Sequence, residues 1–316
     1  MRRTIKIFEL VFVLLGAFSV KKSKSFRWSP FFSGVFLAAF IASPAAYGQV
    51  KFTEMVTFGD SLTHNDLLWA VSGKPRNMYG ADPMEAVFRK ASQPGSHLTS
   101  YAVAGTESGD LELEIIAYIA NLTMGEQNKA TFFGIETGGN DILNNVNLLG
   151  AHAPGRNHSA DKVVNNIIQN IRDGFNTLRE SHPKAHFVLW TIPDITLTPK
   201  EWGNLTRTEV ANIRAHLKRV NEAIKKLGNF PSVVVLDLYT LIQNFIKKPP
   251  AIFGHQLQLP PVHGEYDAIF ADEIHPTAVS NALIANTIIR QINAKWQLTV
   301  PSYTKRQLAR LAHINP

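Results

Sequence analysis

Cysteine is absent from the 316 residues of this chain. Without it the chain can form no disulfide framework, no thiol nucleophile and no zinc site with cysteine ligands. The fold must therefore be held together by packing and hydrogen bonds alone. Because 45% of the residues are apolar, the chain has enough hydrophobic side chains to bury a full core.

The chain also has little net charge once its N-terminal segment is set apart. Residues 1–49 contain seven Lys or Arg and one Glu, a net charge of +6 (7 − 1), so only +1 (7 − 6) of the total +7 remains for the other residues. A nucleic-acid-binding protein is expected to keep a basic face. The sequence therefore argues against nucleic acid as a partner.

Residues 1–49 are typical of a leader that directs export. A basic start precedes two apolar runs, IFELVFVLLGAFSV and FFSGVFLAAFIA, and the small-residue sequence SPAAYGQ. This order predicts a secretory signal peptide, cleaved between Ala46 and Gln49, and a mature protein that is secreted or lies in the periplasm or cell envelope. A pair of short membrane anchors is the alternative, although the first run contains Glu9 and is shorter than the roughly 20 residues that span a bilayer.

The rest of the chain has no internal repeat, low-complexity tract or long linker, which predicts one domain over residues 50–300 and a C-terminal tail over 301–316. Short β-branched or aromatic runs alternate with longer amphipathic stretches, the pattern of βα units around a parallel sheet covered on both faces. We predict an α/β fold, a three-layer α/β/α sandwich with a parallel, flavodoxin-like sheet of about five strands. The predicted strands are 52–58, 97–103, 130–137, 186–192 and 233–238, and the predicted helices are 107–121, 159–181, 206–227 and 277–294.

Polar clusters follow three of these strands, and a further cluster precedes the last helix. Ligands of an open α/β sheet bind beyond the carboxyl ends of its strands, so we expect the clusters to meet at one edge. The sequence FGDSL contains Ser61, YAVAGTESGD contains Gly105, ETGGNDIL contains Asn140, and ADEIHP contains Asp272 and His275.

Taken in this order, FGDSL, the glycine after the second strand, GGND and DEIHP resemble the SGNH, or GDSL, family of hydrolases. The resemblance extends from about Phe58 to the final helix, and four ordered motifs are far more specific than any one of them. It implies a triad in which Ser61 is the nucleophile, His275 is the base and Asp272 orients the imidazole. Nucleophilic catalysis by a serine requires the same roles, because a serine hydroxyl is a weak nucleophile until a neighbouring base activates it.

The resemblance also implies an oxyanion hole. Its donors would be the backbone N–H groups of Ser61 and Gly105 and the side-chain amide of Asn140. A glycine lets the substrate approach the backbone closely, and an amide donates a hydrogen bond without carrying charge. This chemistry needs no metal and no organic cofactor.

Simpler interpretations of the same residues exist. Ser61 could be part of a helix cap or turn, and Asp141 is expected to cap a helix. Asp272 and His275 could be half of a metal site, although the sequence offers no third ligand at a suitable spacing. The chain lacks the G-x-S-x-G elbow of the α/β-hydrolases, which argues against that family.

The residues that follow Ser61 leave the acyl substrate open. Some lipolytic members of the family read GDSLSDTGN, whereas this chain reads GDSLTHND. We interpret His64 and Asp66 as pocket wall or as solvent-facing side chains. An apolar segment is expected to face the site and to suit a lipid chain. Its residues are Ile252, Phe253, Leu257, Leu259 and Val262.

We therefore predict a secreted serine hydrolase that cleaves carboxylic ester bonds through an acyl-enzyme on Ser61. It would be an esterase or lipase, with a lysophospholipase as one form. A carbohydrate acetyl esterase is the first alternative, and a non-catalytic binding protein on the same fold is the second. The expected partner is a small-molecule or lipid ester, and the basic tail allows transient contact with a membrane surface. The sequence does not specify the oligomeric state.

Overall fold

The computed structural model describes residues 52–64, 68, 72–122 and 130–315. The predicted leader and Asp66 lie outside the described residues. Among the helices of the described part, none is long and apolar enough to cross a membrane.

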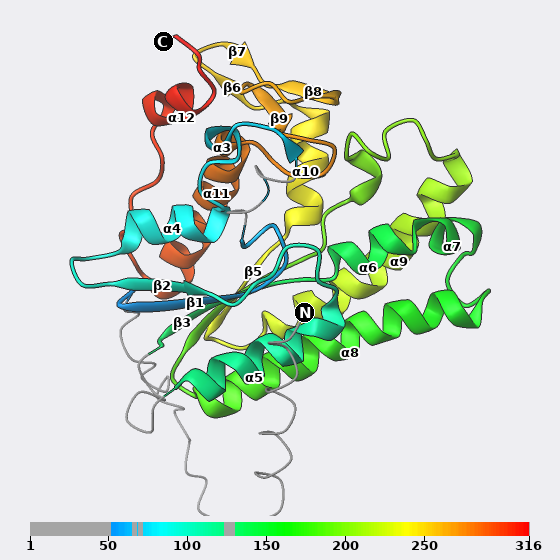
Figure 1. The fold of residues 1–316 in the computed structure, drawn as a ribbon, viewed down its shortest axis with the longest axis horizontal. Helices are drawn as coiled ribbons and strands as arrows, with labels where there is room; N and C mark the ends of the chain where they lie inside the picture. Colours follow the sequence, from blue (N-terminus) through cyan, green and yellow to red (C-terminus); the bar gives the residue numbers. More distant parts are fainter. Residues whose placement is uncertain (1–51, 65–67, 69–71, 123–129, 316) are drawn as a thin grey trace, which may run out of the picture. The chain divides into compact units, whose positions relative to one another are not determined.

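A parallel sheet of five strands forms the centre of the described fold (Figure 1). All four neighbouring pairs of strands run parallel, in the order β2-β1-β3-β4-β5. This order is that of flavodoxin-like sheets, and the prediction of the fold class is confirmed. The strands are β1 (Glu54–Gly59), β2 (His97–Ser100), β3 (Phe132–Glu136), β4 (His186–Trp190) and β5 (Val233–Leu236).

One face of the sheet packs against a layer formed by one early helix and two helices from the last third of the chain. Met55 and Phe132 are fully buried in this core, together with side chains of α4 (Pro83–Ala91), α10 (Leu238–Lys247) and α11 (Ala278–Trp296). In Figure 1, α4 and α11 lie on the same side of the strands.

The other face packs against three helices from the middle of the chain. Phe58 and Phe133 are fully buried there, against α5 (Leu111–Asn121), α8 (His158–Ser181) and α9 (Arg207–Leu227). Successive side chains of a strand point to opposite faces, so a strand between two cores needs apolar residues at every position. This is why the predicted strands read as nearly continuous apolar runs.

The long helices begin and end close to their predicted bounds because their sequences carry clear signals. Asn157 accepts a hydrogen bond from the N–H of Ala160 at the start of α8. Thr206 and Glu209 form a capping box at the start of α9. Such caps satisfy backbone N–H groups that have no partner within the helix.

Several short elements were not predicted. The helix α12 packs on α11, and its Leu308 and Ala309 are buried in the same core, so part of the C-terminal tail lies on the domain. The 3-10 turn η1 (Ser108–Asp110) forms the start of the predicted helix 107–121, and α12 spans Lys305–Leu311 within the tail. The unpredicted elements are α3 (Arg76–Tyr79), α4, α6 (Gly139–Asn144), α7 (Val146–Ala151), α10, the 3-10 turn η2 (Ile195–Leu197), and the short strands β6 (Ala251–Ile252), β7 (His255–Gln256), β8 (Gln258–His263) and β9 (Ala268–Phe270).

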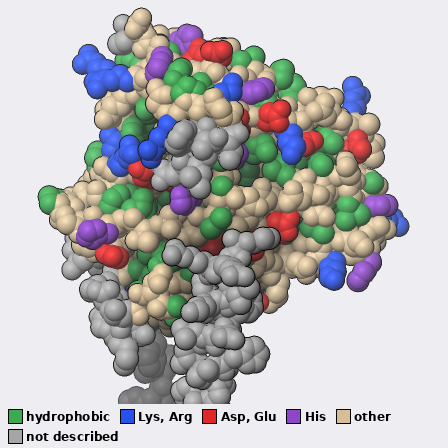
Figure 2. All heavy atoms as spheres, in the orientation of Figure 1, with side chains coloured by type: hydrophobic (Ala, Val, Ile, Leu, Met, Phe, Trp, Pro, Cys, Tyr) green, Lys and Arg blue, Asp and Glu red, His purple; other side chains and the backbone are tan. Residues whose placement is uncertain are grey.

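The surface of the described residues carries mixed charge on the face shown in Figure 2. Lys and Arg side chains lie at the upper left and around the right-hand rim, with Asp and Glu side chains between them. This distribution agrees with the small net charge that remains after the leader is set apart.

Candidate active site

Ser61 lies in a tight turn at the carboxyl end of β1. The turn is closed by two hydrogen bonds to Asp60: its Oδ1 accepts the N–H of Leu62 at 3.0 Å, and its carbonyl oxygen accepts the N–H of Thr63 at 3.1 Å. The turn begins from Gly59, whose φ is +126°. A Cβ at that position would lie 1.4 Å from the carbonyl oxygen of Glu136 on β3, so only glycine fits where the two strands end.

Asp272 and His275 lie in the loop between β9 and α11. Oδ1 of Asp272 accepts the backbone N–H groups of Ile274 at 2.8 Å and of His275 at 2.7 Å. This turn, in which an aspartate side chain binds the backbone two and three residues later, folds the carboxylate back towards the imidazole. Thr277 then caps α11 by accepting the N–H of Ser280.

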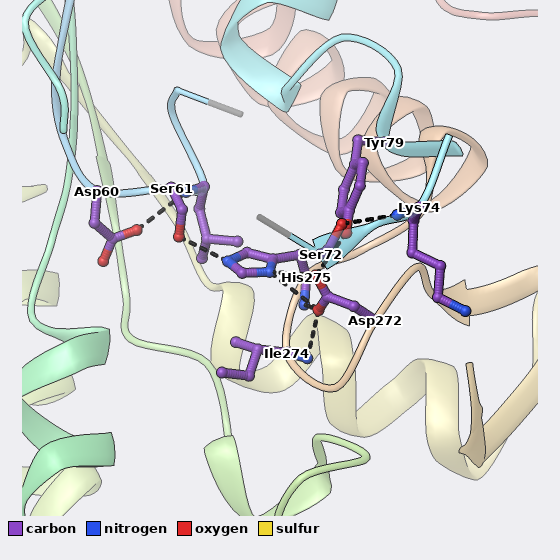
Figure 3. Close-up of polar contacts among 9 residues, drawn as sticks. Asp60, Ser61, Ser72, Lys74, Tyr79, Asp272, Ile274 and His275 are labelled. Atoms are coloured by element: carbon purple, nitrogen blue, oxygen red, sulfur yellow. Dashed lines mark hydrogen bonds and ion pairs between the residues drawn. The ribbon is translucent and has the colours of Figure 1, made fainter. Parts of the chain in front are cut away.

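The three predicted triad residues meet in one chain of hydrogen bonds (Figure 3). Nε2 of His275 lies 2.8 Å from Oγ of Ser61, and Nδ1 lies 2.8 Å from Oδ2 of Asp272. With the proton of the neutral ring on Nδ1, Nε2 is free to accept the serine proton. The side chains of His275 and Asp272 are only 16% and 17% exposed. The hydrogen-bonded relay formed by Ser61, His275 and Asp272 is therefore largely shielded from water.

Asp272 is held in its ionised form. Burial by itself would raise its pKa, but hydrogen bonds and the charge interaction with His275, together with two backbone N–H groups, hold the pKa of Asp272 well below its usual value. An ionised carboxylate at this position can stabilise the positive imidazolium that forms when His275 takes a proton.

A fourth residue, which was not predicted from the sequence, joins this relay. The hydroxyl of Tyr79, at the end of α3, donates a hydrogen bond to Oδ2 of Asp272 at 2.8 Å (Figure 3). α3 has only four residues, and its sequence RNMY gives no periodic signal that could have marked the tyrosine.

The predicted oxyanion donors are placed differently from one another. Asn140 lies in the first turn of α6, and both Ser61 and Asn140 line the cavity described below. Nδ2 of Asn140 donates to the carbonyl oxygen of Thr106 at 2.8 Å and approaches Oδ2 of Asp60 at 3.4 Å. Gly105 has φ +88° and lies in the exposed loop after β2, and it is not among the residues that line this cavity.

Three buried acids lie beneath the serine turn. Burial, followed by the charge of Asp60, raises the pKa of Glu136 well above its usual value, and burial also raises the pKa of Asp60. Oε2 of Glu114 accepts the N–H of Gly59 at 2.7 Å, and burial raises the pKa of Glu114 to about 8. A protonated acid here avoids placing several negative charges beneath Ser61.

A largely apolar cavity of about 50 Å³ adjoins Ser61. At about 10–15 Å³ for each water-sized probe, this volume has room for about three to five non-hydrogen atoms. Ser61 and Asn140 are polar residues of its lining. The apolar side chains that line it include Leu62, Leu143, Trp190, Leu238, Ile242 and Ile284.

The apolar segment 252–262 does not line this cavity, so the expectation that it faces the site is wrong. Ile252 and Leu257 are each 2% exposed and pack into the core of α10 and α11, whereas Phe253 and Val262 are exposed. The apolar sequence signalled burial correctly for two positions, but the partner is the core of the domain.

The structure also bears on the predictions made for His64 and Asp141. His64 is half-buried and its Nδ1 lies 2.8 Å from the carbonyl oxygen of Ala102, and it does not line the cavity at Ser61. Asp141 was expected to cap a helix, and it does not. Its carboxylate accepts the N–H and the hydroxyl of Ser108 at 2.7 and 2.8 Å, which ties η1 to α6.

The described residues contain no group of three or more His, Asp or Glu side chains that could hold a metal ion. The polar groups at Ser61 lie in line from hydroxyl to imidazole to carboxylate. A serine hydroxyl, an imidazole and a carboxylate in line can activate the hydroxyl for attack on a carbonyl carbon.

The sequence of this chain also matches a known protein family. Residues 55–288 match the family model described as GDSL-like Lipase/Acylhydrolase. No curated protein sequence matches the chain.

Similar solved structures come from several ester hydrolases. A lipase from a goat rumen metagenome is 17% identical and aligns over 75% of this chain and 96% of its own, with a TM-score of 0.51. A phospholipase A1 from Streptomyces albidoflavus NA297 is 19% identical, over 77% of this chain and 99% of its own, with a TM-score of 0.45. A variant of an acetylxylan esterase from Geobacillus stearothermophilus is 13% identical, over 80% and 98%, with a TM-score of 0.45. The first of these supports the fold, and because the family model matches most of the sequence, this chain belongs to the GDSL-like lipase/acylhydrolase family.

Proposed function

We propose that this protein is a serine hydrolase that cleaves carboxylic esters through an acyl-enzyme on Ser61. The observation that carries the proposal is the line of hydrogen bonds from Oγ of Ser61 through His275 to the ionised Asp272. Each contact lies within the reach that proton transfer requires.

The reaction runs in two halves. His275 takes the proton of Ser61 as Oγ attacks the ester carbonyl carbon, and the carbonyl oxygen becomes a negatively charged oxyanion. His275 then returns the proton to the leaving alcohol, and the acyl group stays on Oγ. In the second half, water attacks the acyl-enzyme by the same route and frees the acid and Ser61.

The oxyanion needs hydrogen-bond donors that are already in place. We assign this role to the backbone N–H of Ser61 and to Nδ2 of Asn140. One hydrogen of this amide is donated to Thr106, and the other makes only a long contact of 3.4 Å with Oδ2 of Asp60, which an oxyanion can replace. Gly105 remains a prediction as a third donor.

The cavity beside Ser61 supports a short, apolar acyl group. An acyl group with about three to five carbons beyond its carbonyl carbon fits this volume, whereas an acetyl group would leave much of it empty and a long lipid chain would not be enclosed. We therefore favour a short-chain esterase over a lipase, a lysophospholipase or a carbohydrate acetyl esterase.

A series of p-nitrophenyl esters from acetate to palmitate, tested on the wild type and on Ser61→Ala, decides the question. We expect an optimum near butyrate or hexanoate and loss of activity in the variant. Fluorophosphonate labelling with peptide mapping should mark Ser61, and Ser181→Ala, at the exposed end of α8, serves as the control. Equal activity of the wild type and Ser61→Ala would overturn the proposal, and hydrolysis of acetate alone would favour the acetyl esterase.

Export is also part of the proposal and rests on the composition of residues 1–49. The test is to express the full chain and a form that lacks these residues, and to measure ester hydrolysis outside and inside the cells. Activity that stays inside with both forms would contradict export.

A further inference from the structure

The hydroxyl of Tyr79 is placed to act on the triad through Asp272. It donates to Oδ2, which is the carboxylate oxygen closer to Nδ1 of His275, and the tyrosine ring stands edge-on to the imidazole with the centroids 6.3 Å apart. Tyr79 is only 1% exposed, so water does not compete for this contact.

The backbone fixes Tyr79 in this position. Its carbonyl oxygen accepts a hydrogen bond from Nδ2 of Asn281 in α11 at 3.0 Å. The next residue, Gly80, packs so closely on α11 that a Cβ there would lie 2.6 Å from Cβ of Ala278. The tyrosine is thus attached to the same helix that begins just after His275.

The carboxylate does not depend on Tyr79 for its orientation. Its Oδ1 already accepts two backbone N–H groups, and these keep the turn around Asp272 closed. What Tyr79 adds is a second donor on Oδ2, opposite the imidazole. A donor on this oxygen stabilises its negative charge and weakens its pull on the imidazole proton.

We propose that Tyr79 acts on the relay through Asp272: its hydroxyl shares the negative charge on Oδ2, so that the relay stays active to lower pH. This inference rests on the proposed function of Ser61. The tyrosine stays a neutral donor over the working range, because burial and then the neighbouring Asp272 raise the pKa of its hydroxyl above the ordinary value.

Few other ionisable groups face His275. Asp60 interacts with it from the end of β1, and Asp82, at the start of α4, lines the same small cavity as Tyr79 and His275. The start of α11 presents Asn281 to this cavity. Lys74 lies near Tyr79, and its ammonium points away from the relay in Figure 3. These groups are common to the wild type and the variants below, so they do not alter the comparison.

The test is the rate at which a fluorophosphonate labels Ser61, measured against pH, with kcat and KM measured in parallel. Tyr79→Phe should move the acid limb of the labelling rate and of kcat/KM upward by about half a pH unit. The plateau of kcat should change by less than about threefold and KM should stay the same, because the loss of a donor to Asp272 leaves substrate binding intact.

Incorporation of 3-fluorotyrosine at position 79 tests the opposite direction. Its hydroxyl is more acidic and a stronger donor, so the acid limb should move to lower pH. Tyr118→Phe is the matched control, because Tyr118 is 3% exposed and its hydroxyl bonds to Nε2 of His182 at 2.9 Å away from the relay. It should lower thermal stability without moving the limb.

The outcomes separate this inference from the function on which it rests. If Ser61→Ala abolishes labelling but Tyr79→Phe leaves the acid limb in place, Tyr79 has only a structural role and the inference fails alone. If Ser61 is not labelled in the wild type, the proposed function fails. Should Tyr79→Phe not fold, the fluorotyrosine protein decides, and a limb that does not move downward overturns the inference.

Discussion

Nδ2 of Asn140 donates a hydrogen bond to the carbonyl oxygen of Thr106 at 2.8 Å. This contact joins the first turn of α6 to the loop after β2. The hydroxyl of Thr106 lies 3.1 Å from the carbonyl oxygen of Gly59, directly before the serine turn. The amide of Asn140 is thus fixed before any substrate arrives, and donors that need no rearrangement are the ones that stabilise an oxyanion most effectively.

We predict that Asn140→Ala lowers kcat by about 10²–10³-fold with little change in KM, since the lost donor acts on the transition state. The control is Asn144→Ala in the same helix, which loses a hydrogen bond to Oε1 of Glu107 at the surface. Steady-state kinetics on one short-chain ester provide the measurement. Similar losses in both variants would mean that Asn140 acts only through the structure of α6.

Asp272→Asn should lower kcat/KM by about 10³–10⁴-fold while the protein stays folded. An asparagine can still accept the N–H groups of Ile274 and His275, but it carries no charge to stabilise the imidazolium. Asp267→Asn is a matched control, because Asp267 also pairs with a histidine, His255, at 2.7 Å on the exposed side of the loop. Kinetics and thermal unfolding of both variants test the prediction, and an active Asp272→Asn protein would remove the carboxylate from the relay.

The sequence was sufficient to place Ser61 and Asn140 because both follow strands whose apolar runs were unmistakable. Parallel strands bring their carboxyl ends to one edge, and the geometry of the site follows from that. Tyr79 could not be found in this way. It lies 193 residues from Asp272, at the end of a four-residue helix, and nothing local distinguishes it from a core tyrosine.

The lining of the cavity beside Ser61 could not be predicted from the sequence either. Its walls include Leu238 and Ile242 of α10, a helix that the sequence analysis did not predict. Ile252 and Leu257 were expected there instead, and they pack into the core. The apolar character of a residue predicts that it will be buried. It does not predict which surface covers it, because that depends on the packing of segments distant in the sequence.

Enlarging the cavity should lengthen the preferred acyl chain. Ile242 is 5% exposed and lines the cavity, so we predict that Ile242→Ala moves the optimum of the p-nitrophenyl series upward by about two carbons. Ile288→Ala in α11 is the control, because Ile288 is fully buried in the same core and does not line the cavity. Both variants should lose about 2–5 kcal/mol of stability. A shift of the optimum in both, or in neither, would contradict the assignment of the acyl site.

The buried acid Glu114 should make the protein less stable as the pH rises. Its folded pKa is raised to about 8, chiefly by burial, from an ordinary value of 4.5. Between these two values the folded chain binds a proton that the unfolded chain has lost. The free energy of unfolding therefore falls with rising pH, by up to about 1.4 kcal/mol per pH unit from this group, and levels off above about pH 8.

Glu114→Gln removes this titration and can keep the hydrogen bond from the N–H of Gly59. The decline in the free energy of unfolding between pH 5 and pH 8 should be shallower in the variant than in the wild type. Asp82, whose pKa burial raises to about 7, and Glu136, Asp60 and Asp141, whose pKa values burial also raises, contribute to the decline that remains. Urea unfolding across this pH range measures it, with Glu112→Gln, exposed on the same helix, as the control. Parallel curves for the wild type and Glu114→Gln would show that Glu114 is ionised in the folded protein at neutral pH.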